Sequence, residues 1–204
     1  ALVSLATKTP PASSWAAQRY LTKRGVTKSD ILKWKIGYCP EGEYAGRIIV
    51  PSFNSHGYAN YFIARSYGYE WPRYKNPPAS RDIIFNELYV NWDEDIVIVE
   101  GVFDAIKAGN AVPLLGSTLR EGSALLEALV KNNTRVFMAL DEDVSRKSRS
   151  IARLLLKYGV EAYEVNTSGF EDVGEMSKEE FQVRKANASF IERDNYLLQR
   201  LSAI

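Results

Sequence analysis

Between residues 95 and 166 the chain alternates short apolar runs with helical patterns, and few folds fit such an alternation. The apolar runs suit buried strands: DIVIVEG (95–101), AVPLLG (111–116), RVFMALDED (135–143) and VEAYEVN (160–166). The stretches between them have helical spacing. Strands that alternate with helices over short connections form a parallel sheet with helices on both faces and right-handed crossovers. We therefore expect an α/β domain here, with ligands at the carboxyl ends of its strands.

The first half of the chain has a different pattern. Two short helices are expected between residues 14 and 33, and the β-rich runs 47–53 and 58–68, separated by the turn NSHG, predict a hairpin. A loop rich in Pro, Arg and Tyr follows. This half should form a small mixed α+β subdomain.

These patterns divide the chain into four expected parts. They are a linker or N-terminal extension at 1–19, the mixed subdomain at 20–92, the α/β domain at 93–176 and a helical tail at 177–204. The chain begins at Ala1 without a methionine, and the early segment TPPASS is typical of a linker. We expect a processed protein or an excised fragment.

Composition excludes some classes of site. The 26 Lys and Arg residues balance 25 Asp and Glu residues, so a nucleic-acid site must depend on local clusters of charge. The single cysteine, Cys39, and the single histidine, His56, cannot form a Cys/His zinc site or a disulfide within the chain. No apolar run approaches the roughly 20 residues that span a bilayer, so we expect a cytoplasmic protein with no membrane partner.

Acidic residues end two of the predicted strands. Glu100 follows DIVIV and precedes Gly101, which favours a tight turn into a helix that carries Asp104. Asp141 and Asp143 follow VFMAL and point the same way on an extended segment. If the strands are neighbours, these carboxylates converge and repel one another unless a hard cation such as Mg²⁺ binds, which suits phosphoryl transfer. The alternative is that each acidic group only caps the next helix.

The two acidic segments, VIVEGVFDA and VFMALDED, closely resemble the Toprim signature. Between and after them, AVPLLGSTLREG and GFEDVGEM resemble further segments of bacterial and phage-type (DnaG-like) DNA primases. Upstream, YLTKRGVTKSDILKWKIGYCP, RIIVPSFNSHGYANYFIARSY and PRYKNPPASRDIIFN resemble the start and the β-rich subdomain of the primase RNA polymerase core. The resemblance runs from about residue 20 to residue 181.

The resemblance implies a fold and a metal site. The fold would be a Toprim domain, a Rossmann-like parallel sheet with helices on both faces, preceded by a small mixed α+β subdomain. Glu100, Asp141 and Asp143 would be catalytic ligands of Mg²⁺ or Mn²⁺, two or more ions in all, with Asp172 as a further ligand. The chain departs from the family where Glu142 replaces a glycine. It departs again where a glycine, Gly174, replaces the second aspartate of the last segment, so that this ligand is absent or is supplied by Glu175.

Basic and aromatic residues alternate in the β-rich part. Cations follow a phosphate backbone and aromatic rings stack on unpaired bases, although aromatic residues of a hairpin can equally be core and arginines solvated. The resemblance favours contacts with nucleic acid or nucleotide, first of all from Arg65 and Lys75. The full candidate set is Arg47, Arg65, Arg73, Tyr74, Lys75 and Asn76. Arg146, Lys147 and Arg149, at the start of a later helix, either meet a triphosphate or lie on a solvated face.

The function that the resemblance implies is synthesis of RNA primers from ribonucleoside triphosphates on a single-stranded DNA template. It further implies a replicative helicase and a zinc-binding domain outside this chain, in the cytoplasm of a bacterial cell or a phage-infected host. Two alternatives stay open. One is a Toprim nuclease or topoisomerase fragment; the other is a non-catalytic module that binds single-stranded DNA with a degenerate metal site.

Overall fold

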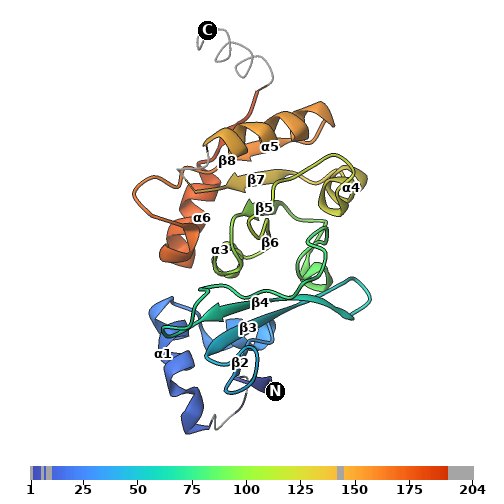
Figure 1. Cartoon of the computed structure of the whole chain (residues 1–204). Helices are drawn as coiled ribbons and strands as arrows, with labels where there is room; N and C mark the ends of the chain where they lie inside the picture. The colour runs from blue at the N-terminus through green and yellow to red at the C-terminus, as the bar shows by residue number, and fades with distance from the viewer. Residues whose placement is uncertain (1, 6, 8–10, 142–144, 193–204) are drawn as a thin grey trace. The chain divides into compact units, whose positions relative to one another are not determined.

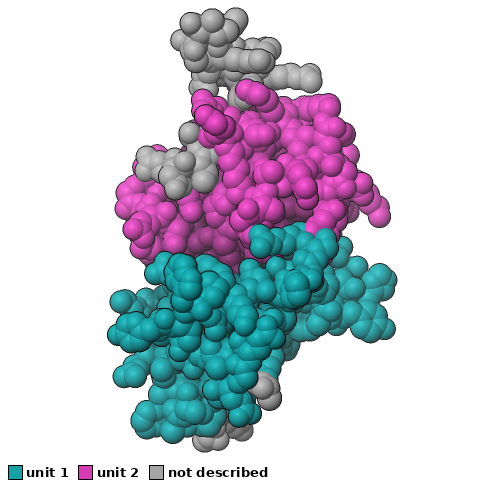
Figure 2. Space-filling view, in the orientation of Figure 1, with its two compact units in different colours: residues 1–81, 85–88 teal, residues 82–84, 89–204 magenta. Residues whose placement is uncertain are grey.

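A computed structural model describes residues 2–5, 7, 11–141 and 145–192. The chain forms two compact units (Figure 2). Unit 1 comprises residues 1–81 and 85–88, and unit 2 comprises residues 82–84 and 89–204. In the described part of the chain, no helix combines the length and the apolar character needed to cross a membrane.

Unit 1 contains an antiparallel sheet of four strands in the order β1-β2-β3-β4 (Figure 1). The strands are β1 (Val3–Ser4), β2 (Gly37–Cys39), β3 (Arg47–Phe53) and β4 (Ala59–Ser66). The helical segments are η1 (Ala12–Ser14), α1 (Trp15–Lys23) and α2 (Lys28–Lys33), and a short 3-10 turn, η2 (Glu87–Tyr89), lies at the boundary of the two units. The predicted hairpin is confirmed, because β3 pairs with β4 from Arg47 opposite Ser66 to Ser52 opposite Tyr61.

Local signals in the sequence place the two helices of unit 1. Gly25, with φ of +64°, follows the end of α1, and Thr27 caps α2. The Thr27 hydroxyl accepts a hydrogen bond from the Asp30 amide at 3.2 Å, and the Asp30 carboxylate accepts one from the Thr27 amide at 2.9 Å. The segment expected to be a linker, 1–19, instead includes β1 and the beginning of α1. Two residues of strand carry no periodicity, so the sequence pattern could not reveal β1.

Unit 2 contains a sheet of five strands in the order β6-β5-β7-β8-β9. Its strands are β5 (Ile96–Val99), β6 (Ala111–Pro113), β7 (Val136–Ala139), β8 (Ala162–Glu164) and β9 (Ser189–Phe190). Its helices are α3 (Val102–Ala108), α4 (Ala124–Lys131), α5 (Ser145–Lys157) and α6 (Lys178–Ala186), with a 3-10 turn η4 (Val173–Glu175). The first four strands are parallel, and β9 is antiparallel to β8. The expected helical tail thus contributes one strand, β9, to this sheet.

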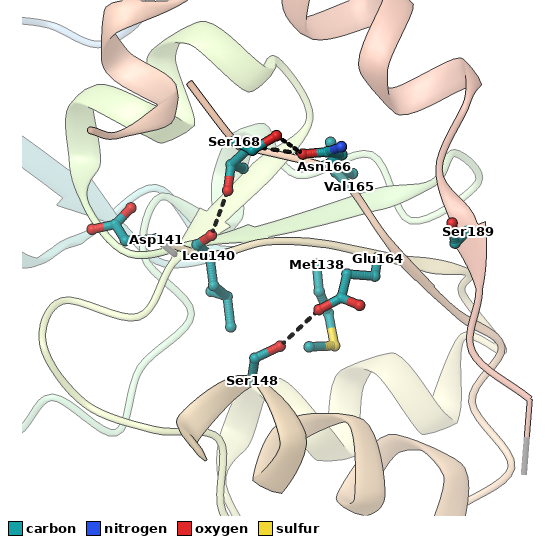
Figure 3. A pocket seen from close by; sticks show the side chains of 10 residues that line it. Met138, Leu140, Asp141, Ser148, Glu164, Val165, Asn166, Ser168 and Ser189 are labelled. Atoms are coloured by element: carbon teal, nitrogen blue, oxygen red, sulfur yellow. Dashed lines mark hydrogen bonds between the residues drawn. The ribbon is translucent and has the colours of Figure 1, made fainter. Parts of the chain in front are cut away.

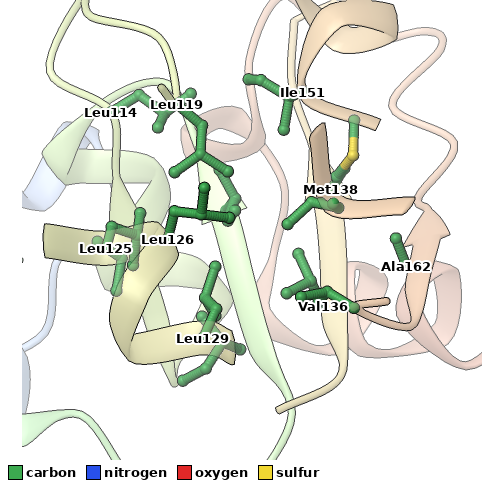
Figure 4. Close-up of a cluster of buried hydrophobic side chains, with 14 of the residues drawn as sticks. Leu114, Leu119, Leu125, Leu126, Leu129, Val136, Met138, Ile151 and Ala162 are labelled. Atoms are coloured by element: carbon green, nitrogen blue, oxygen red, sulfur yellow. The ribbon is translucent and has the colours of Figure 1, made fainter. Parts of the chain in front are cut away.

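Helices cover both faces of this sheet. On one face, Ile98 and Met138 belong to a buried cluster with Leu129 of α4 and Leu155 of α5 (Figure 4). On the other face, α3 packs against α6, whose Lys185 lies 4.7 Å from the ring centroid of Phe137. Residues one apart on a strand point to opposite faces, so the uniformly apolar strands reflect burial on both sides. The expected α/β fold is confirmed.

Candidate active site

The first two acidic segments meet at one edge of the parallel sheet. Strands β5 and β7 are direct neighbours in parallel register, with Val99 opposite Ala139. Glu100, directly after β5, therefore lies at the same edge of the sheet as Leu140 and Asp141, which directly follow β7. The segment after β6 holds the backbone of Glu100 at this edge, because the Leu115 amide donates a hydrogen bond to the Glu100 carbonyl at 3.0 Å. The adjacency that the sequence pattern required for converging carboxylates is present.

Asp104 accepts hydrogen bonds from two segments of the site, one with each carboxylate oxygen. Its side chain is 5% exposed. One oxygen, Oδ2, accepts a hydrogen bond from the Gly101 amide at 2.7 Å, and the other, Oδ1, accepts one from the Gly174 amide at 2.9 Å. Burial, and after it the negative charges of Asp172 and Asp141, raise the pKa of Asp104 to about 7, although the hydrogen bonds from the two amides lower it. Asp104 thus joins the turn after Glu100 to the loop that carries Asp172.

Gly101 is required for space rather than for backbone freedom. Its φ of −122° and ψ of 168° are extended values open to any residue, so the tight-turn reason given from the sequence is wrong. A Cβ atom at Gly101 would instead lie 2.9 Å from Oδ2 of Asp104. The Glu-Gly pair of the motif therefore leaves room for the Asp104 carboxylate.

Two carboxylate oxygens at this edge are buried without a hydrogen bond. Glu100 Oε1 and Asp172 Oδ1 have no hydrogen-bond partner among the residues that the structure describes. The second oxygen of Glu100, Oε2, lies 2.6 Å from Nζ of Lys147, and the two side chains are 15% and 20% exposed. A buried carboxylate oxygen that lacks a donor costs free energy, and a bound cation would remove that cost.

The donor chemistry at this edge fits Mg²⁺, which binds through one or two carboxylates and completes its shell with water and phosphate oxygens. Glu100 Oε1 and Asp172 Oδ1 are buried carboxylate oxygens of the kind that such an ion prefers. Within residues 2–5, 7, 11–141 and 145–192, however, no group of three or more His, Cys, Asp or Glu side chains is arranged to hold a metal ion. Asp143, one of the three expected catalytic ligands, and Glu142 lie outside the described residues.

The remaining candidates in unit 2 lie in different settings. Glu175, the alternative ligand, is exposed, and its Oε2 accepts a hydrogen bond from the Glu171 amide at 3.1 Å. Arg146 is exposed at the start of α5, whereas Lys147 reaches Glu100. The structure therefore separates the two basic residues that the sequence could not distinguish.

A cavity of about 370 Å³ opens beside the site at the ends of β7 and β8 (Figure 3). Its lining is mostly polar, over an apolar floor that includes Met138. Glu164, at the end of β8, lies in it with its Oε1 3.4 Å from the Ser148 hydroxyl of α5. Asp141 belongs both to this lining and to the acidic edge. Sequence reasoning missed Glu164, although its place at a strand end next to β7 was the signal that could have found it.

Two of the expected nucleic-acid contacts are buried. Arg47 and Arg65 are each 5% exposed. The Arg47 guanidinium donates to the carbonyls of Ala45 and Pro72 at 3.0 and 3.1 Å. Arg65 donates to the Tyr20 hydroxyl at 2.9 Å, and its guanidinium lies 4.6 Å from the ring centroid of Tyr74. Both arginines make contacts within unit 1, so neither is an exposed cation in this structure.

The other candidates of unit 1 lie on the segment that returns along β4. Arg73 is exposed, and the Lys75 side chain, 36% exposed, pairs with Glu43 at 3.3 Å. Asn76 Oδ1 accepts a hydrogen bond from the Ala64 amide at 3.3 Å. Tyr74 is 44% exposed, and desolvation of its hydroxyl raises its pKa.

The loop before this segment exposes two further aromatic side chains, Tyr69 and Trp71, which are 105% and 87% exposed. Together with Arg73, Tyr74 and Lys75 they form what we call the loop surface.

Comparison with known proteins gives related chains. No protein-family model matches the chain. The DNA primase of Thermotoga maritima is 29% identical over 214 residues, which cover 80% of this chain. The match covers 37% of that relative, so the chain spans little more than a third of its length.

Solved structures share the fold. A DnaG primase catalytic domain, solved bound to single-stranded DNA, superposes with a TM-score of 0.77 at 20% identity, over 94% of this chain and 77% of that one. The Aquifex aeolicus primase, solved with its zinc-binding and RNA polymerase domains, superposes with a TM-score of 0.74 at 22% identity, over 87% and 57%. The chain is thus similar in sequence to a bacterial DNA primase, and it has the Toprim-type fold of the solved primase cores.

Proposed function

We propose that this chain is the catalytic core of a primase that joins ribonucleoside triphosphates into short RNA primers on single-stranded DNA. The observation that carries the proposal is the pair of buried oxygens without hydrogen bonds, Glu100 Oε1 and Asp172 Oδ1, at the strand edge that Asp141 shares. The sequence relative and the structural neighbours with primase names support it.

In this mechanism the chain acts by positioning and charge rather than by a covalent intermediate. Glu100, Asp141 and Asp172 would hold Mg²⁺ or Mn²⁺, with Asp143 as a further ligand. When bound, the metal would neutralise the triphosphate oxygens while a 3′-hydroxyl attacks the α-phosphorus, pyrophosphate leaves and the hydroxyl proton passes to water. Asp104 would keep the Asp172 loop in place through its hydrogen bond with Gly174.

The loop surface is the proposed guide for the template. The exposed Arg73 and the partly exposed Lys75 would follow the phosphates of a single strand, and the exposed rings would offer stacking platforms for bases. The structural neighbour solved with single-stranded DNA is consistent with such a template. A replicative helicase and a zinc-binding domain outside this chain are the expected partners in the cytoplasm, and the neighbour from Aquifex aeolicus carries a zinc-binding domain.

The test is extension of a short RNA primer annealed to a DNA template, with labelled ribonucleotides and Mg²⁺ or Mn²⁺. An annealed primer removes any need for an initiation domain. The chain should extend it, Glu100→Gln and Asp141→Asn should abolish extension, and Glu179→Gln, an exposed carboxylate of α6, should leave it unchanged. Digestion of DNA without ribonucleotides would favour a nuclease. DNA binding that is equal in EDTA, with no incorporation, would favour a non-catalytic module.

A further inference from the structure

The ion pair between Lys147 and Glu100 places a protein cation where a metal ligand is expected. Nζ of Lys147 lies 2.6 Å from Oε2 of Glu100, and both side chains are largely buried. The other oxygen, Oε1, has no hydrogen-bond partner in the described residues. The ammonium group of Lys147 therefore neutralises the charge of the Glu100 carboxylate but contacts only one of its two oxygens.

A divalent cation bound at Oε1 of Glu100 would repel the ammonium group of Lys147 beside Oε2. Mg²⁺ binds a carboxylate oxygen at about 2.1 Å, so an ammonium group that kept its place beside the same carboxylate would be repelled at close range. A lysine can yield its position without unfolding the helix, because its charge sits on a flexible four-carbon stem. Lys147 lies in the first turn of α5, so its ammonium group would stay within reach of this strand edge.

We propose that Lys147 serves as a stand-in cation for Glu100 in the metal-free protein, and that it binds phosphate oxygens of a nucleoside triphosphate once a divalent cation holds Glu100. The choice of a nucleoside triphosphate as the ligand rests on the proposed function. An ammonium group released beside the acidic edge needs a new anionic partner, and lysine is a common point-charge ligand of phosphates. A triphosphate brought to the metal supplies that partner.

Removal of the Lys147 charge should lower the melting temperature in EDTA and the affinity for ATP with Mg²⁺, but raise the affinity for Mn²⁺. Without metal, Glu100 loses its counter-charge, so Lys147→Gln should melt at a lower temperature than the wild type in EDTA. Mn²⁺ alone should bind several-fold more tightly, because no protein cation competes for Glu100. ATP with Mg²⁺, in the absence of template, should bind about tenfold more weakly, as expected for the loss of one hydrogen bond to a charged group. A purely structural lysine would weaken all binding together.

The experiment measures these quantities by calorimetry and thermal denaturation for Lys147→Gln, Lys147→Arg and a control, Arg153→Gln. Arg153 is an exposed cation of the same helix, so its removal changes net charge equally and should alter each affinity by less than twofold. Lys147→Arg keeps the charge and should retain most of the ATP affinity. Unchanged or weaker Mn²⁺ binding by Lys147→Gln would overturn the stand-in role, and unchanged ATP binding would overturn the phosphate role.

A second measurement uses the wild-type chain, so it does not depend on a variant that folds. Acetylation of lysines, followed by mass spectrometry, should modify Lys147 slowly in EDTA, faster with Mg²⁺ alone, and slowly again with Mg²⁺ and ATP. Lys131, exposed on α4, should react equally in all three conditions. Equal reactivity of Lys147 throughout, or a wild-type chain that binds no Mn²⁺, would overturn the inference. If these results hold but no primer is extended, the proposed function fails and the inference stands.

Discussion

Asp104 should make the metal-free protein less stable as pH rises. Asp104 is 5% exposed, and burial with the charges of Asp172 and Asp141 raises the pKa of its carboxyl from 3.8 to about 7. Between pH 3.8 and about 7, Asp104 is therefore protonated in the folded state and ionised in the unfolded state. The free energy of unfolding is highest near pH 3.8, and it falls as pH rises until pH passes the folded pKa of about 7. At about 1.4 kcal/mol per unit, the full effect is about 4 kcal/mol, of which roughly 2–3 kcal/mol should appear between pH 5 and pH 8.

The assay is urea unfolding in EDTA at several pH values from 5 to 8, for the wild type and for Asp104→Asn. The variant cannot titrate at this position, so the difference between the two proteins isolates Asp104 from other groups. Asparagine keeps one acceptor oxygen, but its amide nitrogen faces a backbone donor, so the variant should also lose about 1–3 kcal/mol at every pH. Glu179→Gln is the matched control on an exposed carboxylate. If the difference between wild type and Asp104→Asn does not change with pH, the raised pKa is refuted.

Three further changes test other parts of the structure. Leu129→Ala, at a fully buried position of α4, should lower the free energy of unfolding by about 2–5 kcal/mol in urea titrations, and a loss below 1 kcal/mol would contradict the packing in Figure 4. Gly101→Ala should reduce primer extension at least tenfold by displacing the carboxylate that lies 2.9 Å from the added methyl group, and full activity would contradict that contact. Lys75→Ala should flatten the dependence of single-strand binding on log salt by about 0.7. Arg65→Ala should instead lower stability with little change in that slope, and equal slope changes in both variants would restore Arg65 as a phosphate contact.

Strands β5 and β7 could be predicted because each is an uninterrupted run of four buried apolar residues, and the three-residue strands β6 and β8 lie within the longer runs expected from the sequence. The order of the acidic segments then predicted one edge of the sheet, and β5 and β7 are indeed neighbours. By contrast, β1 and β9 have two residues each, and they exist only because a partner strand lies beside them. Such strands depend on tertiary contacts that no local pattern records.

The burial of charged side chains was harder to predict than the strands. The sequence shows that Arg65 is a cation on a predicted strand. Its environment, however, depends on Tyr20, 45 residues away, and on Tyr74. The role of Lys147 likewise depends on Glu100, 47 residues earlier. A sequence gives the charge of a residue, whereas its exposure and partner come from chain segments that the fold brings together.

The return of the loop surface along β4 protects an edge of the sheet. β4 is the last strand in its sheet, and strands in that position can pair with other chains through unpaired amides and carbonyls. Here the Ser66 amide donates to the Arg73 carbonyl at 2.9 Å, and the Lys75 amide donates to the Ala64 carbonyl at 3.0 Å. The chain thus occupies the end of this edge with its own backbone. The same segment that offers cations and rings to a template would also limit aggregation through β4.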